Sequence, residues 1–216
     1  SDNMKIFLDT ADTKEVGKYF DRGLVDGVTT NPTLIRKSGR KPKDVYRELH
    51  LMGIPDISME IVGDSSYMID EGKRLFDEFG AATTIKVPCT PDGLLACRAL
   101  SKELISVNVT LIFCAAQAIL AAKSGATYVS PFVGRCDDNS VAGLEVVRSI
   151  AELYARQRVR TEVLAASIRD VYKVTRAFYN GADIVTVPPS ILDKMYNHVL
   201  TDAGLVQFDN DWKAFS

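Results

Sequence analysis

Eight short apolar runs, separated by longer amphipathic segments, constrain the fold of this 216-residue chain more than any other feature. The runs are rich in Val, Ile and Thr, which favour strands. Most of them lack strict alternation of apolar and polar residues, as expected of parallel strands buried on both faces. Between the runs, apolar residues recur at helical spacing. The eight runs cover residues 5–9, 28–31, 57–61, 84–87, 107–111, 127–131, 163–166 and 184–187.

This alternation predicts an α/β protein, a single (β/α)8 TIM barrel domain over residues 1–216 with an extra C-terminal helix. The alternative is a doubly wound open sheet, which usually carries a glycine-rich phosphate loop after its first strand. Here the first run is followed by Thr10-Ala11-Asp12, and the sequence contains neither GxGxxG nor GxxxxGK[ST]. The barrel is therefore the favoured fold.

The tail of the chain, residues 202–216, falls outside the eight units. It contains Phe208, Trp212 and Phe215 near helical spacing, which predicts an amphipathic helix. Such an apolar stripe has to be covered. The helix either packs on its own barrel or docks on a neighbouring subunit, since exposed apolar patches usually mark interfaces.

The charge and hydropathy patterns exclude several classes of partner. The chain has 26 basic and 28 acidic residues, a net charge of −2 and no basic block, so we expect no nucleic-acid partner. The longest apolar run, residues 111–122, is interrupted by Gln117. It is well short of the ~20 residues that span a bilayer, and no secretory signal is visible, so we expect no membrane partner.

Cysteine and histidine usage limits the chemistry. The four cysteines show neither CxxC nor metal-ligand spacing, which fits a reducing compartment and predicts a cytoplasmic location. The chain has only two histidines, His50 and His198, so a zinc site or a Ser-His-Asp triad is a poor explanation. We expect no metal and no cofactor, and catalysis by lysine, carboxylates and hydroxyls.

Lys86 is the central candidate, because function in such a barrel lies at the carboxyl ends of the strands. It stands within the apolar run Thr84-Ile85-Lys86-Val87. In the alternative without a catalytic role, its ammonium extends along the apolar surface to solvent. Inside the barrel mouth, by contrast, desolvation would disfavour the charged form, and a neutral amine can attack a carbonyl to form a Schiff base. That chemistry needs neither a metal nor a cofactor.

Other strand ends carry groups that could assist such a lysine. Asp9 and Glu60 could act as acid and base, or serve only as a helix cap or an ion-pair partner. Thr110 could hold a water or a substrate hydroxyl. Arg135 and Arg169 follow neighbouring strands and, together with Ser167, make a plausible phosphate clamp. The alternative for the two arginines is a pair of surface ion pairs.

Five motifs together resemble transaldolase, over a stretch from about Met4 to Ser216. The chain is most similar to the small subfamily that includes fructose-6-phosphate aldolase. The resemblance implies a (β/α)8 barrel and a homo-oligomer, a pentamer or decamer, whose C-terminal helix reaches a neighbouring subunit. The motifs are FLDTA at residues 7–11, GVTTNP at 27–32, IKVP at 85–88, NVTLIF at 108–113 and SPFVGR at 130–135.

The same resemblance implies the roles of the reacting groups. Lys86 would attack the C2 carbonyl of a ketose phosphate, and Asp9 would take the C4 hydroxyl proton as the C3–C4 bond breaks. Glu60 and Thr110 would position a water that moves protons during imine formation. The remaining family positions would bind the substrate: Asn31 and Ser130 the three-carbon unit, and Arg135, Ser167 and Arg169 the phosphate.

The implied partners are small-molecule sugar phosphates of the pentose phosphate pathway. A dihydroxyacetone unit would pass from fructose 6-phosphate or sedoheptulose 7-phosphate to erythrose 4-phosphate or glyceraldehyde 3-phosphate. The alternative is a fructose-6-phosphate aldolase that releases free dihydroxyacetone. The aldolases carry Gln at the position of Glu60 and Tyr at that of Phe132, so this chain has the transaldolase form. A second alternative is a catalytically silent barrel that serves as a binding or assembly module. Such a barrel would show no substrate-dependent borohydride adduct at Lys86.

Overall fold

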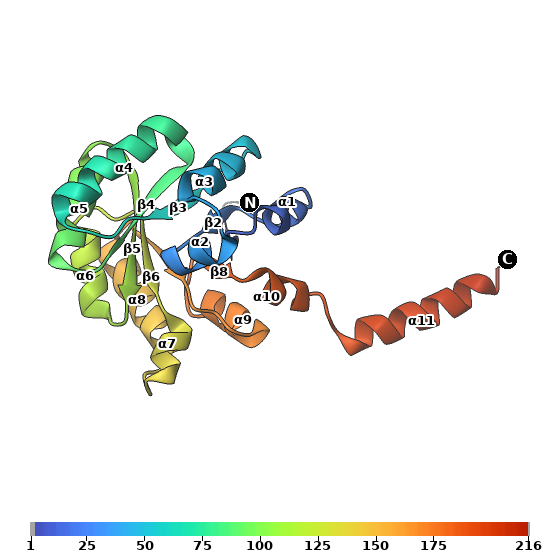
Figure 1. The fold of residues 1–216 in the computed structure, drawn as a ribbon. Coiled ribbons are helices and arrows are strands. Elements are labelled where there is room, and N and C mark those ends of the chain that lie inside the picture. Colours follow the sequence, from blue (N-terminus) through green and yellow to red (C-terminus); the bar gives the residue numbers. More distant parts are fainter. Residues whose placement is uncertain (1–2, 216) are drawn as a thin grey trace.

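A computed structural model describes residues 3–215, and eight parallel strands in this part of the chain close into a barrel (Figure 1). Each strand pairs with its neighbours in the sequence, and β8 closes the barrel against β1. The α/β barrel predicted from the sequence is thereby confirmed. The strands are β1 (Lys5–Asp9), β2 (Gly27–Thr29), β3 (Ile57–Glu60), β4 (Thr83–Pro88), β5 (Ser106–Ile112), β6 (Tyr128–Pro131), β7 (Glu162–Ala165) and β8 (Ile184–Val187).

Helices surround the barrel and connect its strands on the outside. Within residues 3–215, none is long and apolar enough to cross a membrane. A short 3-10 turn, Gly80–Ala82, precedes β4. The α-helices are α1 (Thr13–Phe20), α2 (Pro32–Ser38), α3 (Pro42–Leu51), α4 (Ser65–Phe79), α5 (Pro91–Lys102), α6 (Ala115–Lys123), α7 (Val133–Asp138), α8 (Gly143–Gln157), α9 (Val171–Tyr179), α10 (Pro189–Lys194) and α11 (Val199–Lys213).

The interior of the barrel is closed by an aromatic and aliphatic layer. Phe7, Tyr128, Leu164 and Ile184, from four different strands, form a buried cluster separate from the main core. The rings of Phe7 and Tyr128 meet edge to face, with centroids 6.2 Å apart. Leu164 also lines the cavity at the barrel mouth, so this layer forms the floor of that cavity. The outward-facing strand residues pack instead against the helices.

The tail helix α11 projects away from the barrel (Figure 1). It has no buried residue, and it begins three residues before the predicted tail; Ser216 lies outside the described residues. Leu205, Phe208, Trp212 and Phe215 recur at spacings of three and four, and each is at least 60% exposed. The helix α11 therefore does not pack on its own barrel. Of the two alternatives for covering its apolar stripe, docking on a neighbouring subunit is the one that this arrangement leaves open.

Candidate active site

Lys86 lies at the mouth of the barrel, on the fourth residue of β4. Only 6% of the residue is exposed, although it is a lysine. Its Nζ donates a hydrogen bond to the Thr30 carbonyl oxygen at 3.2 Å and lies 3.7 Å from Glu60 Oε1. The flanking Ile85 and Val87 belong to the apolar core between strands and helices. Because side chains alternate along a strand, this packing turns Lys86 into the barrel.

Asp9 ends β1 and faces the same cavity as Lys86. Thr29 Oγ1 donates a hydrogen bond to Asp9 Oδ1 at 2.9 Å, and Thr29 Oγ1 and Thr186 Oγ1 are 2.6 Å apart. The single hydroxyl proton of Thr29 is used on Asp9, so Thr186 is the donor in the second contact. Burial raises the pKa of Asp9, while the charge of Lys86 and the Thr29 hydrogen bond oppose that rise.

Glu60 stands directly beside Lys86 in the sheet, since the two residues are partners in the β3–β4 register. Burial raises the pKa of Glu60, and the neighbouring Lys86 charge works against that rise. The negative charge of Asp9 raises the pKa of Glu60 further, and Arg135 lowers it. The charges of Lys86, Asp9 and Arg135 therefore all act on the pKa of Glu60.

Thr110 lies one strand further round, on β5, and is 2% exposed. Its Oγ1 is buried and has no hydrogen-bond partner within the described part of the chain. The register between β5 and β6 is interrupted between Val109 and Ile112, and Leu111 there has a φ of 61°. A bulge of this kind re-aims side chains near a site, and Thr110 does not line the cavity that holds Lys86.

The cavity itself has a volume of about 230 Å³. A buried polar chain runs below it, in which Ser130 Oγ donates to Asn108 Oδ1 at 2.7 Å and Asn108 Nδ2 donates to Ser58 Oγ at 3.3 Å. Asn31 lines the cavity at the start of α2, where its side chain accepts a hydrogen bond from Leu34 N at 2.9 Å. Hydroxyl and amide groups therefore line the same cavity as the lysine and offer hydrogen-bond donors and acceptors to a bound ligand.

The opposite wall of the cavity is cationic. Arg135, in α7, and Arg169, after β7, both line it together with Ser167. Gly134 brings their two segments together, because its N–H donates to the Ser167 carbonyl oxygen at 2.8 Å. Ser167 has a left-handed backbone with a φ of 55°, which costs roughly 1–2 kcal/mol for a residue other than glycine. Strain of this kind is concentrated at functional sites.

Phe132 adds an aromatic ring to the cavity lining beside Arg135. The Arg135 guanidinium carbon lies 5.1 Å from the centroid of the Phe132 ring, within cation–π range. Phe132 also meets Phe113, with centroids 5.8 Å apart. An apolar ring therefore packs against one of the two arginines of the cationic wall.

The structure brings most of the predicted site residues together. Eight line the one cavity: Asp9, Asn31, Lys86, Ser130, Phe132, Arg135, Ser167 and Arg169. Glu60 reaches the site through Lys86 and also lines a neighbouring pocket beside α3 and α4, whereas Thr110 lies behind the cavity wall. Sequence reasoning missed Thr29 and Thr186, because a threonine in a strand carries no signal beyond strand propensity.

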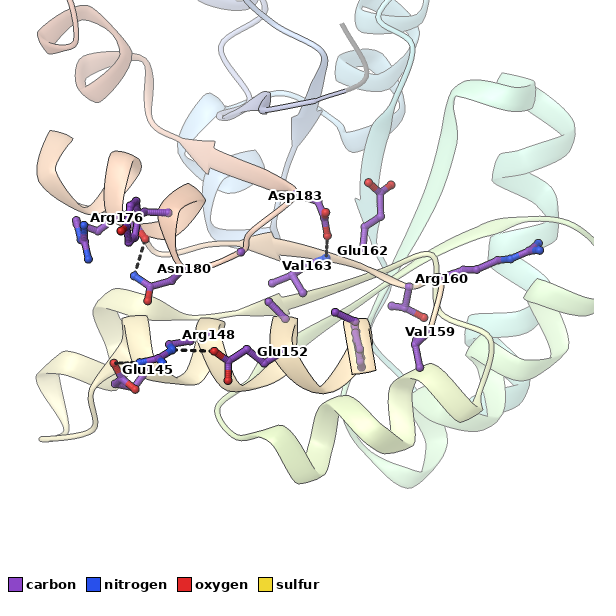
Figure 2. A pocket seen from close by; sticks show the side chains of 16 residues that line it. Glu145, Arg148, Glu152, Val159, Arg160, Glu162, Val163, Arg176, Asn180 and Asp183 are labelled. Atoms are coloured by element: carbon purple, nitrogen blue, oxygen red, sulfur yellow. Dashed lines mark hydrogen bonds and ion pairs between the residues drawn. The ribbon is translucent and has the colours of Figure 1, made fainter. Parts of the chain in front are cut away.

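A larger cavity, of about 770 Å³, lies elsewhere. Figure 2 shows it beside α8 and α9, at the amino ends of β7 and β8, and it contains none of the predicted site residues. Three of its charged groups are engaged with each other, since Arg148 pairs with both Glu145 and Glu152. Because catalytic groups of this fold gather at the carboxyl ends of the strands, the smaller cavity is the candidate active site.

No cluster of three or more His, Cys, Asp or Glu residues is arranged to hold a metal ion within the described range.

Comparison with known proteins finds relatives over nearly the whole length of this chain. The family model described as transaldolase/fructose-6-phosphate aldolase matches residues 6–216. A probable transaldolase of Nitrosopumilus maritimus (strain SCM1) is 50% identical over 212 residues, which cover 97% of this chain and 95% of that relative. A probable transaldolase of Paracoccus denitrificans (strain Pd 1222) is 50% identical over 210 residues, with 97% and 96% covered.

Solved structures show the fold alone. Two flavocytochrome b2 variants are similar, with TM-scores of 0.59 and 0.60 and 13% sequence identity. The match covers 87% of this chain and 57% of each of those chains. At this identity the likeness concerns the barrel and not its chemistry.

Proposed function

Because the chain belongs to the transaldolase/fructose-6-phosphate aldolase family, and is an enzyme of that family, we propose that it transfers a dihydroxyacetone unit between sugar phosphates through a Schiff base on Lys86. The observation that carries this proposal is the buried Lys86 amine, 3.7 Å from Glu60 Oε1, in a cavity shared with Asp9 and two arginines. The proposed substrates are ketose and aldose phosphates of the pentose phosphate pathway.

The reaction begins with attack of the neutral Lys86 amine on the C2 carbonyl of the ketose phosphate. Loss of water from the carbinolamine gives the protonated imine, which is the electron sink for the next step. The position of Lys86 supports this role, because the residue lines the cavity that would hold the substrate carbonyl. Its amine donates a hydrogen bond to the Thr30 carbonyl oxygen and pairs with the Glu60 carboxylate at 3.7 Å, and these contacts hold it at the mouth of the barrel.

Asp9 is the proposed base for carbon–carbon cleavage. It takes the proton of the C4 hydroxyl as the C3–C4 bond breaks, the bonding electrons pass to the imine, and the aldose phosphate leaves. Burial raises the pKa of Asp9 toward the range in which a carboxylate both accepts and returns a proton efficiently. The Thr29 hydrogen bond holds the carboxylate in a fixed orientation.

Transfer completes the cycle. The enamine left on Lys86 attacks the carbonyl carbon of the acceptor aldose phosphate, and protonated Asp9 returns its proton to the new hydroxyl. Water then hydrolyses the imine and releases the longer ketose. Glu60 is the proposed proton carrier for the imine steps, given its contact with Lys86. Thr110 does not line the cavity itself, but its buried hydroxyl has no hydrogen-bond partner among the described residues, which supports its proposed role as a partner for the reacting water.

The cationic wall supports recognition of a phosphate at the far end of the substrate. Two guanidiniums and the Ser167 hydroxyl offer the planar donor sets that suit phosphate oxygens. Phe132 supports transfer rather than release of the three-carbon unit, since a phenyl ring has no hydroxyl with which to deliver water or protons to the enamine.

The experiment that tests this function is a paired assay with fructose 6-phosphate, with and without erythrose 4-phosphate, following glyceraldehyde 3-phosphate. A Lys86→Ala variant is inactive in both arms, and Lys123→Arg, on the exposed end of α6, serves as the matched control. Product formed only with the acceptor supports transaldolase. Comparable product without it, together with free dihydroxyacetone, identifies an aldolase instead.

The projecting α11 supports a homo-oligomer in which this helix docks on a second copy of the chain. Phe208 and Trp212 on this helix, and Phe215 just after its end at Lys213, are 68%, 74% and 85% exposed. A contiguous exposed apolar stripe of this size is unusual for a monomer.

A further inference from the structure

Asp138 makes an unassigned contact with the cationic wall. It is the last residue of α7, and both of its carboxylate oxygens accept from Arg169 Nη1, at 2.6 and 2.7 Å. The Arg169 and Asp138 side chains are 53% and 54% exposed. This carboxylate therefore engages Nη1 alone and leaves the other nitrogens of Arg169 without a hydrogen bond to Asp138.

Arg169 lines the cavity together with Arg135 and Ser167. A Cβ at Gly134 would lie 2.7 Å from Arg169 Nε and 2.9 Å from Ser167 Oγ, so Nε lies against the first turn of α7, next to Arg135. A guanidinium is planar and its five donors form a rigid fork. Fixing Nη1 therefore fixes the direction in which the other donors point.

We propose that Asp138 is a positioning residue, which aims the free donors of Arg169 at the substrate phosphate between Arg135 and Arg169. This inference rests on the proposed function. An arginine side chain without this partner would lose considerable rotamer freedom on binding phosphate. The negative charge of Asp138 does not prevent phosphate binding, because it is about half exposed to screening water and bonds to a single guanidinium nitrogen, Nη1.

A second ion pair on the same helix provides a matched control. Asp137 Oδ2 accepts from Lys173 Nζ at 2.5 Å and so ties α7 to α9. This pair does not include Arg169. Loss of the Lys173 contact loosens the attachment of α7 without removing the partner of the arginine, which separates positioning of Arg169 from general packing of α7.

The test compares Asp138→Ala, Asp138→Asn and Lys173→Met in the full chain, with a phosphorylated and an unphosphorylated acceptor. Asp138→Ala should raise the KM for glyceraldehyde 3-phosphate roughly three- to five-fold, the scale that an exposed ion pair supplies, with kcat unchanged. The KM for glyceraldehyde should stay the same. Asp138→Asn keeps one acceptor oxygen, so its KM for glyceraldehyde 3-phosphate should lie between those of the unaltered enzyme and Asp138→Ala. An unchanged or lower KM in Asp138→Ala, or an equal rise in Lys173→Met, would overturn the proposal.

A binding measurement separates this inference from the proposed function. Isothermal titration with inorganic phosphate should give a Kd that rises three- to five-fold in Asp138→Ala and is unchanged in Lys173→Met. If the unaltered enzyme transfers no three-carbon unit but shows this pattern, the proposed function fails and the positioning role stands. If transfer occurs and Asp138→Ala binds phosphate as tightly as the unaltered enzyme, only the positioning role fails.

Discussion

Glu60 and Lys86 are direct partners across the β3–β4 pair, and their charged atoms lie 3.7 Å apart at the mouth of the barrel. Strand register alone brings the carboxylate to the amine, with no contribution from a loop. Sites built on strands are held more rigidly than sites on loops. In the proposed mechanism, this relationship lets Glu60 accept a proton from Lys86 before attack and return one during hydrolysis.

The acid side of the pH–rate profile should respond to Thr29. Its hydrogen bond favours the charged carboxylate of Asp9 and so lowers a pKa that burial has raised. Thr29→Val removes this bond, so the pKa of Asp9 rises further and the base is lost at a higher pH. The acid limb of kcat/KM should move upward in pH.

Thr186→Val is the matched comparison for this shift. Thr186 contacts Thr29 at 2.6 Å, and no hydrogen bond joins it to Asp9 within the described residues. Its acid limb should therefore move in the same direction by a smaller amount. Identical profiles for Thr29→Val and the unaltered enzyme would contradict the assignment of Asp9 as the base.

Gly134→Ala should damage phosphate recognition. The added methyl group would lie 2.5 Å from the Ser167 carbonyl oxygen and 2.7 Å from Arg169 Nε, so α7 and the segment after β7 must separate. We expect a loss of roughly 1–3 kcal/mol in stability and a higher KM for phosphorylated acceptors. Denaturant unfolding and steady-state kinetics measure both. Gly204→Ala, with no atom within 4 Å of its new methyl group, should change neither KM nor fold.

The other end of the barrel contains a buried carboxylate whose partners should matter for stability. Tyr128 Oη donates to Asp56 Oδ2 at 2.5 Å, and Thr84 Oγ1 donates to Asp56 Oδ1 at 2.9 Å. Tyr128→Phe removes a donor from a carboxyl group and should cost roughly 1.5–3 kcal/mol in urea unfolding. Tyr154→Phe removes a donor from the Ala118 carbonyl and should cost only about 0.5–1.5 kcal/mol. Equal losses of stability in the two variants would contradict the expectation that the hydrogen bond to the Asp56 carboxyl group contributes more than the one to the Ala118 carbonyl.

Deletion of residues 199–216 should reduce the mass of the particle in light scattering, because the exposed stripe on α11 is then lost. The double variant Phe208→Ser/Trp212→Ser keeps the helix and should have the same effect, since the apolar side chains provide the contact. A mass that is unchanged in both variants would show that α11 is not part of an interface.

Much of the fold follows from the sequence because hydrophobic periodicity is a local signal. The predicted bounds of the first and last strands match β1 and β8, and the others differ by one or two residues at their ends. Asp64 and Thr90 cap α4 and α5 with their side chains, as their positions before helical runs predict. The ends of strands are harder to predict from the sequence than their centres, because they depend on pairing with a neighbouring strand and not on residue propensity.

The sequence predicts those site residues whose type is unusual at their position. It does not predict residues whose role depends on a contact with a residue far away in the chain. A lysine inside an apolar strand stands out in the sequence, and so do two arginines after neighbouring strands. The Thr29–Asp9 and Asp138–Arg169 contacts join residues 20 and 31 positions apart, and no local pattern announces them. The bulge beside Thr110 likewise depends on the register with β6.

Borohydride reduction in the presence of fructose 6-phosphate tests the central claim most directly. Reduction of the proposed intermediate would fix the three-carbon unit on the enzyme, and peptide mass mapping would locate it. We predict a substrate-dependent adduct on Lys86, at a single site, that disappears in Lys86→Ala and persists in Lys123→Arg. The absence of any substrate-dependent adduct, or its attachment to a different lysine, would contradict the Schiff-base account.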